Sequence, residues 1–309
     1  MLTLSVLVAG SVGVLVDRLT RSGPVVVIPA CQVSADGQSV SMSVDQAANA
    51  ATIAAVGLAR GLPVRAVQVA LATAIQESTL RNLDFGDRDS LGLFQQRPSQ
   101  GWGTPAQIMD PVYAASRFYA ALVRVPDYLR IPITEAAQSV QHSAHPQAYA
   151  DHQVQALALA RALTGAAPAS LSCQLPPTSP PTVATDPGGF TPAAAAVRQS
   201  MTRQFGTRLL PTVVAAPGRS GGALVARLGP GRAGSTASPT SGRAPTGGTA
   251  TGWAVAVWTV AHAQRLGIAE VSYANRTWQL LSSQRGWQPA TAGPQGTAAP
   301  PGTVLIILG

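Results

Sequence analysis

The sequence predicts an α+β protein in which an all-helical domain precedes a small α+β domain. Alanine-rich sequence with helical periodicity and recognisable helix caps extends from residue 43 to residue 165. A segment rich in Pro, Ser and Thr follows, and short runs of β-branched residues lie near the C-terminus. With 309 residues, the chain is long enough for two domains of modest size.

Two helices begin the helical domain. Ser43 and Gln46 form a capping-box pattern at the start of the first helix, which is expected to run through alanine-rich sequence to Arg60. A glycine and Pro63 then predict a stop and a new start. The second helix, expected from Pro63 to about Ser78, is apolar nearly all round and is therefore predicted to be central and buried.

Further helices are expected in the rest of this domain. Thr104-Pro105 and Asp110-Pro111 each combine an N-cap residue with proline at the first helical position. A polar loop is expected between the second helix and these starts. The later helices are predicted over 111–124, 134–143 and 146–164, with Gly165 as the stop.

The second half is expected to hold little regular structure outside one helix and three strands. A linker is predicted over 166–192, and a long loop over 217–252, because both are rich in residues that favour irregular backbone. The regular elements are predicted as an amphipathic helix over 253–267 and strands over 268–273, 276–281 and 303–308.

The N-terminus is predicted to be an export signal or membrane anchor over residues 1–24, followed by an extracytoplasmic lead-in over 25–42. The run of fifteen residues from Leu2 to Val16 carries no charge, which suits a signal h-region or short anchor better than a full span of about 20 residues. A buried N-terminal helix is the alternative. The expected location is therefore extracytoplasmic, either membrane-anchored or secreted.

The two cysteines, Cys31 and Cys173, lie on either side of the helical domain. A disulfide between them would close a very long loop, for which chain-entropy models give about 4–5 kcal/mol of stabilisation. Such a bond forms in an oxidising compartment, in agreement with the N-terminal segment. Two unpaired buried thiols are the alternative.

The charge of the chain narrows the choice of partners. The net charge is +8, and all 21 basic residues are arginine, which suits an anionic partner such as lipid, nucleic acid or an acidic wall polymer. Nucleic acid is not expected, because the arginines are scattered singly without interleaved aromatic residues. No metal or other cofactor is expected, since His142, His145 and His152 have no acidic or thiol ligand at metal spacing.

Glu77 is the candidate catalytic acid. Cleavage of a glycosidic bond requires a carboxylic acid that is still protonated near neutral pH, because the leaving oxygen must receive a proton. Glu77 ends an apolar helix, where burial penalises its ionised form and the helix dipole disfavours negative charge. A solvated glutamate at a helix end is the alternative interpretation.

The residues around this acid resemble a known family. Glu77-Ser78, followed by Gly92-Leu93-Phe94-Gln95, is similar to the Glu-Ser … Gly-Leu-Met-Gln signature of the soluble lytic transglycosylases, at that family's spacing. The resemblance covers roughly 40% of the chain, within residues 43–165. It implies a lysozyme-like helical domain that cleaves peptidoglycan glycan strands.

The same resemblance implies roles for individual residues. Glu77 would be the sole catalytic acid/base, and Ser78 would contribute to substrate binding. The turn from Gly92 through Leu93 to Gln95 would line the sugar groove, with Gln95 hydrogen-bonding near the acid. Tyr149 is similar to the tyrosine of the family's Ala-Tyr motif on a later helix, where it supports the acid.

The loop after the acid departs from the family pattern, because Arg81-Asn82-Leu83-Asp84 replaces its usual Asn-Pro-x-Ala. Three carboxylates lie in this loop, at Asp84, Asp87 and Asp89. One could be the base of an inverting hydrolase, or all three could cap turns and pair with arginines. A lytic transglycosylase needs no second carboxylate, since the muramoyl 6-hydroxyl attacks C1 and leaves a 1,6-anhydro end. The segment 87–102, which ends on a tryptophan able to stack on a sugar, resembles an actinobacterial branch of lysozyme-like wall proteins.

Residues 252–287 resemble a C-terminal domain of actinobacterial wall proteins that is similar to zinc D-alanyl-D-alanine carboxypeptidases. Pro239 and Thr246 stand where the His and Asp of the zinc motif should be. After Asp186 the only candidate ligands are His262 and Glu270, fewer than a catalytic zinc needs. A metal-free binding or packing module is therefore predicted.

The sequence is compatible with two functions of different classes. The first is an exported or membrane-anchored enzyme that cleaves glycan strands; the second is a lysozyme-like binding or scaffold protein of the cell envelope. An open groove at Glu77 with Gln95 and Tyr149 nearby favours the enzyme, and a filled groove favours the scaffold. The expected partners are peptidoglycan and, through the N-terminal segment, the membrane. The predicted domain boundaries are 1–24, 25–42, 43–165, 166–192 and 193–309.

Overall fold

The computed structural model describes most of the chain. The described residues are 28–142, 146–177, 190–209, 212–216, 222–228, 249–291 and 298–309. The signal or anchor predicted over 1–24 lies outside them, as do Pro239 and Thr246 of the zinc-motif comparison. Within the described part of the chain, no helix has both the length and the apolar character needed to cross a bilayer.

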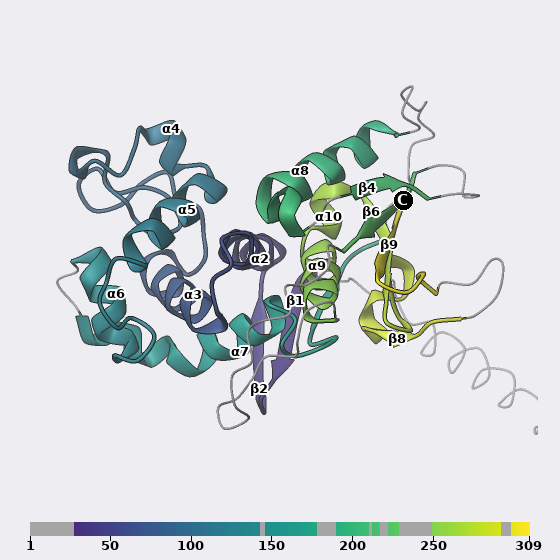
Figure 1. Cartoon of the computed structure of the whole chain (residues 1–309), viewed down its shortest axis with the longest axis horizontal. Coiled ribbons are helices and arrows are strands. Elements are labelled where there is room, and N and C mark those ends of the chain that lie inside the picture. Colours follow the sequence, from purple (N-terminus) through teal and green to yellow (C-terminus); the bar gives the residue numbers. More distant parts are fainter. Residues whose placement is uncertain are drawn as a thin grey trace, which may run out of the picture.

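The first part of the structure, residues 28–177, is mainly helical, as predicted, and the second part, residues 190–309, is built on a β-sheet (Figure 1). The fold class is therefore α+β. The helical elements of the first part are α2 (Val44–Ala59), α3 (Val64–Ser78), η1 (Pro98–Gln100), α4 (Pro105–Ile108), α5 (Pro111–Leu122), α6 (Ile133–Gln141), η2 (Pro146–His152) and α7 (Gln153–Leu163).

Local signals account for the ends of these helices. The Ser43 side chain accepts a hydrogen bond from the amide of Gln46, and the Gln46 side chain accepts one from the amide of Ser43, which confirms the capping box. Helix α3 is buried over most of its length and ends at Thr79 in the left-handed conformation. One difference is that the helix expected over 146–164 begins with a 3-10 segment.

A three-stranded sheet, with the strand order β2-β1-β3, flanks the helical part. Strands β1 (Ala30–Ala35) and β2 (Gln38–Met42) lie in the predicted lead-in, and β3 (Leu171–Gln174) lies in the predicted linker, so the description of 166–192 as a plain linker is wrong. The sequence does carry the signal for the β1–β2 hairpin. Asp36 and Gly37 both have positive φ, and Asp-Gly is a preferred loop for a two-residue hairpin.

This small sheet brings the two cysteines together. Cys31 on β1 lies directly opposite Cys173 on β3, with their Cα atoms 3.9 Å apart, and the two residues form a disulfide. The pairing predicted from the positions of the cysteines is therefore confirmed. The bond joins β1, which precedes the first helix of the helical part, to β3, which follows α7, the last helix of that part.

The second part contains a six-stranded sheet of strand order β4-β5-β9-β6-β7-β8, in which all neighbouring strands are antiparallel. The predicted strands over 268–273 and 303–308 are confirmed. Its elements are α8 (Pro192–Leu209), β4 (Thr212–Ala215), β5 (Ala223–Arg227), α9 (Thr249–Ala261), α10 (Ala263–Leu266), β6 (Ile268–Tyr273), β7 (Arg276–Gln279), η3 (Leu280–Arg285), β8 (Gln288–Pro289) and β9 (Thr303–Leu308).

Three expectations for this part need correction. Strand β5 lies inside the segment predicted to be a loop, because four apolar residues between glycine-rich flanks are enough for a buried strand. Helix α8 was not expected. Helix α9 begins before Trp253, and every residue from Gly252 to Ala261 is buried, so it is a core helix rather than an amphipathic one.

Helix α9 occupies this central position because the two parts pack directly against each other. One continuous hydrophobic core includes residues of both, and α8 and α9 lie beside α2 (Figure 1). Two tryptophans of the second part donate indole hydrogen bonds to the backbone of β3. Trp278 Nε1 lies 3.1 Å from the Cys173 oxygen, and Trp287 Nε1 lies 2.8 Å from the Leu171 oxygen.

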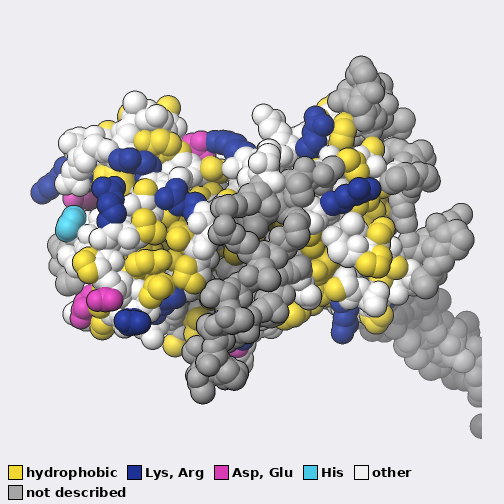
Figure 2. All heavy atoms as spheres, viewed as in Figure 1, with side chains coloured by type: hydrophobic (Ala, Val, Ile, Leu, Met, Phe, Trp, Pro, Cys, Tyr) yellow, Lys and Arg dark blue, Asp and Glu magenta, His cyan; other side chains and the backbone are white. Residues whose placement is uncertain are grey.

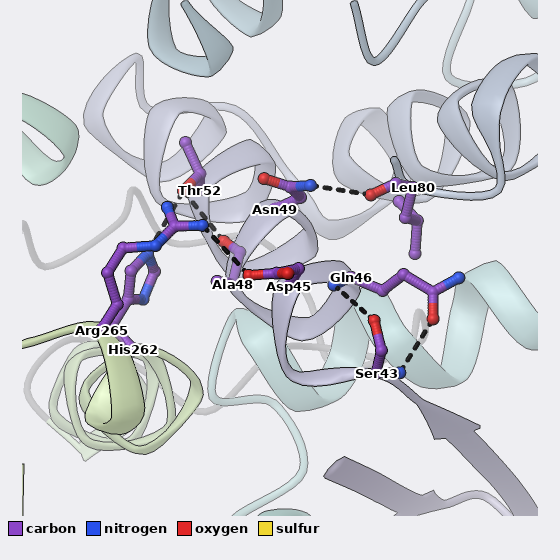
Figure 3. Close-up of polar contacts among 9 residues, drawn as sticks. All are labelled: Ser43, Asp45, Gln46, Ala48, Asn49, Thr52, Leu80, His262 and Arg265. Atoms are coloured by element: carbon purple, nitrogen blue, oxygen red, sulfur yellow. Dashed lines mark hydrogen bonds and ion pairs between the residues drawn. The ribbon is translucent and has the colours of Figure 1, made fainter. Parts of the chain in front are cut away.

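A buried histidine contributes to this packing. The His262 side chain is 3% exposed, and its Nε2 lies 3.4 Å from Thr52 Oγ1 on α2 (Figure 3). Its Nδ1 lies 2.9 Å from the Trp258 carbonyl oxygen, which can only accept, so Nδ1 carries the proton. Nearby, Arg265 pairs with Asp45 at the surface, 3.3 Å apart. His262 therefore faces the helical part as a neutral side chain.

We expect the free energy of unfolding to decrease as the pH falls from about 6.5 to about 4. Burial lowers the pKa of His262 to about 4. Between pH 6.5 and pH 4 this histidine is therefore protonated in the unfolded chain but neutral in the folded protein. The free energy of unfolding is expected to fall by about 3 kcal/mol across this window. Above the ordinary pKa of histidine, His262 is neutral in both states and this loss is absent. Urea unfolding at both ends of the window should show a smaller loss in His262→Gln. Equal losses in the two proteins would refute the assignment.

Candidate active-site groove

Glu77 lies one residue before the end of α3, and its side chain is half-buried. The Tyr149 hydroxyl, from η2, donates a hydrogen bond of 2.6 Å to Glu77 Oε1. Tyr149 is itself fully buried, so its ring is held by packing and its hydroxyl has a fixed direction. The structure therefore brings together the two residues that the sequence motif pairs, although they are 72 positions apart.

Glu77 lines an open groove with a volume of about 1230 Å³. The groove runs between the loop after α3, the C-terminal half of α5 and the end of α6. Besides Glu77, its lining includes Gln95, Trp102, four arginines and His142. The groove is open rather than filled, and concave surfaces of this kind are where ligands usually bind.

Ser78 and Leu93 connect two of the elements that border this groove. Ser78 is buried, and its hydroxyl donates to the Leu93 carbonyl oxygen at 2.8 Å, which ties the end of α3 to the turn that follows. Gly92 has a φ of 76°, and a Cβ there would lie 2.8 Å from the Ile108 carbonyl oxygen. Ser78, Gly92 and Leu93, which were expected to contribute to the sugar site, are not among the residues that line the groove, and Ser78 and Leu93 are buried behind it.

Gln95 does line the groove. Its Nε2 donates to the carbonyl oxygens of Phe85 and Gly92, both at 3.3 Å. These two bonds to the loop backbone fix the position of the Gln95 side-chain amide. Among the described residues, Glu77 and Gln95 share the groove but make no hydrogen bond with each other. In the described part of the chain, Tyr149 is the side chain that hydrogen-bonds to the acid.

The three loop aspartates have different surroundings. Asp89 lies 2.9 Å from the Arg97 guanidinium and accepts a bond of 2.8 Å from the Ser99 amide, and these contacts hold the pKa of Asp89 well below its usual range. The Asp89 carboxylate therefore stabilises the loop through these contacts. Asp84 is exposed and lies outside the groove lining, whereas Asp87 lines the groove and its side chain is 92% exposed. Asp87 is the carboxylate that remains as a possible partner of Glu77.

The sequence did not predict the wall of the groove that lies opposite the loop after α3. Arg117, on α5, and Arg124, just after it, line the groove together with Gln141 at the end of α6. Their spacing of seven along the chain is a local sign that the two arginines share one side of a helix. That spacing does not show which cleft they face. Trp102, the tryptophan that was expected to be able to stack on a sugar, does line the groove.

The histidines lie in different parts of the structure. His142 is exposed at the groove, His145 lies outside the described residues, and His152 Nε2 lies 2.9 Å from Gln76 Oε1. In the second part His262 is buried against α2, and Glu270 accepts a bond of 2.9 Å from Gln279. Across the described ranges, no three His, Cys, Asp or Glu side chains converge as a metal site.

The comparison with known families concerns the second part of the chain. A family model described as VldE, C-terminal domain, matches residues 186–299. The match begins just before α8 and ends before β9, and it does not include the groove at Glu77. No curated protein matches the chain. The second part is therefore similar to this C-terminal domain family.

Proposed function

We propose that this protein cleaves the glycan strands of peptidoglycan and that Glu77 is the catalytic acid. The observation that carries the proposal is the hydrogen bond of 2.6 Å from Tyr149 to Glu77 Oε1 in an open groove of about 1230 Å³. This arrangement agrees with the resemblance of Glu77-Ser78 and the Gly92–Gln95 turn to the soluble lytic transglycosylases.

The geometry suits proton transfer to a glycosidic oxygen. Because Tyr149 donates to Oε1, the other carboxyl oxygen of Glu77 is the one available to carry the transferable proton. Once the proton has left, the Tyr149 hydroxyl stabilises the carboxylate that remains. The same carboxylate can then take a proton from the attacking hydroxyl, so one residue serves as acid and then as base.

The identity of that attacking hydroxyl separates two reactions. In the transglycosylase reaction the muramoyl 6-hydroxyl attacks C1, and the product is a 1,6-anhydro sugar. In hydrolysis by inversion, water attacks with the help of a second carboxylate across the groove. We favour the transglycosylase reaction, because Asp89 is engaged by Arg97 and Ser99, and Asp87 is 92% exposed with a contact of only 3.9 Å to the likewise exposed Arg88.

Mass spectrometry of the products released from purified sacculi tests the proposal. We expect muropeptides that end in 1,6-anhydro-muramic acid. Muropeptides with reducing ends would instead indicate hydrolysis. Retention of the intact sacculi with bound protein would contradict cleavage and indicate the alternative function, a lysozyme-like binding or scaffold protein.

The role of Asp87 can be tested separately. We expect Asp87→Asn to retain activity within about threefold of the unsubstituted protein, because a transglycosylase needs no second carboxylate. Initial rates of product release from sacculi give the measurement. If Asp87 were the base of an inverting reaction, its loss would reduce the rate by about a hundredfold or more.

We propose an extracytoplasmic location and a metal-free C-terminal module for the same protein. The disulfide between Cys31 and Cys173 supports the location, since such bonds persist in oxidising compartments. The burial of His262 supports the second point, because a ligand facing Thr52 in the core cannot reach a metal ion at the surface. The second part would then pack on the helical part or hold a stem peptide.

A further inference from the structure

Two arginines in the groove have no carboxylate partner among the residues that the structure describes. Of the four that line it, Arg97 is paired with Asp89 at 2.9 Å, and Arg88 lies 3.9 Å from Asp87. Arg117 and Arg124 make no ion pair with any side chain in the described part of the protein. Both side chains are exposed. Their positive charges are therefore available to whatever occupies the groove.

Each of these guanidinium groups is nonetheless held in place by one backbone contact. Arg117 Nη2 donates to the Gly101 carbonyl oxygen at 3.1 Å, and Arg124 Nε donates to the Ala120 carbonyl oxygen at 3.0 Å. The remaining N–H groups of each fork stay free to donate. A side chain that is already oriented loses less conformational entropy when it binds a ligand.

The groove has more basic than acidic side chains in its lining. Its lining has four arginines against two carboxylates, Glu77 and Asp87. Figure 2 shows basic side chains spread over the helical part on the face drawn. A neutral polysaccharide needs hydroxyl and amide partners rather than cations, whereas a guanidinium matches a carboxylate in charge and in geometry.

We propose that Arg117 and Arg124 bind carboxylate groups carried by the glycan, so that the groove selects a carboxylated oligosaccharide over a neutral one. This inference rests on the proposed function, which places a glycan strand in the groove. In such a strand every second sugar bears a lactyl ether. Its carboxyl group is either free or joined to a peptide that has carboxylates of its own, and both sources offer the same chemistry to Arg117 and Arg124.

Direct binding to three oligosaccharides of equal length tests the inference. The probes are a neutral chitooligosaccharide, a peptide-free strand with free lactyl carboxylates, and a strand that carries peptides. The full chain with Glu77→Gln is used to prevent turnover, and calorimetry gives the affinities. We expect at least one carboxylated probe to bind about tenfold more tightly than the neutral probe at low salt. The tighter of the two carboxylated probes identifies the source of the carboxylate.

The double substitution Arg117→Gln and Arg124→Gln should remove this preference. We expect about a tenfold loss of affinity for the carboxylated probe and less than a twofold change for the neutral one. About 0.5 M salt should reduce the difference between the probes, because both arginines are exposed. Arg130→Gln is the matched control, since Arg130 is exposed but lies outside the groove lining.

Two outcomes would overturn the inference. Equal affinity for the neutral and carboxylated probes would refute the selection while leaving the glycan site intact. An equal loss for both kinds of probe in the double variant would show that the arginines support the groove rather than the carboxylate. If no probe binds, the proposed function fails together with this inference.

Discussion

Replacement of Glu77 by glutamine is expected to reduce the release of muropeptides from sacculi by about 10²–10⁴-fold, the usual contribution of a general acid. The amide keeps the shape of the side chain and can still accept the hydrogen bond from Tyr149, so the fold of the groove should persist. What it loses is the proton for the leaving oxygen. The rate of product release, followed by mass spectrometry, gives the measurement.

Glu135→Gln is the matched control for this substitution. Glu135 is exposed in the first turn of α6 and does not line the groove, so the same chemical change there should leave the rate unchanged. Tyr149→Phe adds a graded test, because it removes only the hydroxyl that supports Glu77. We expect an intermediate loss of about tenfold. A Glu77→Gln protein that retains full activity would contradict the assignment of the acid.

Removal of the disulfide is expected to destabilise the protein by about 4 kcal/mol. Cys31 and Cys173 are separated by 142 positions, and a cross-link that closes so long a loop restricts the unfolded chain strongly. The double variant Cys31→Ala, Cys173→Ala should therefore unfold at a much lower urea concentration than the unsubstituted protein. The free energies of unfolding, extrapolated to water, give the difference.

A reducing agent provides the control for the disulfide. It should lower the stability of the unsubstituted protein toward that of the double variant and leave the double variant unchanged. Labelling of the unfolded, non-reduced protein should detect no free thiols. A difference in stability below about 1 kcal/mol would show that the bond adds little to the pairing of β1 with β3.

The helices of the first part were predictable because their signals are local. The capping box of Ser43 and Gln46, and the prolines that begin α4 and α5, each act within one turn of the helix. The sequence of α3, apolar nearly all round, likewise predicts its burial without reference to any neighbour. Strands β6 and β9 were found in the same way, from short runs of β-branched residues.

The strands that were missed depend on partners far along the chain. Strand β3 lies in a Pro- and Ser-rich segment and forms because β1, about 140 residues earlier, offers it a free edge. Strand β5 has only five residues, and β9 stabilises it from the far end of the sequence. The β1–β2 hairpin is different, since its Asp36-Gly37 turn is a local signal that the composition of the lead-in concealed.

The sequence by itself determined most helices of the first part, the two cysteines that can pair and, through the motif, the candidate acid Glu77 with Tyr149 as its expected partner. Only the tertiary structure decided that Arg117 and Arg124 form the opposite wall of the groove and that the second part packs on α2. Helix caps and hydrophobic periods arise from interactions within a few residues. A groove is the space left between packed elements, so its lining depends on how those elements pack.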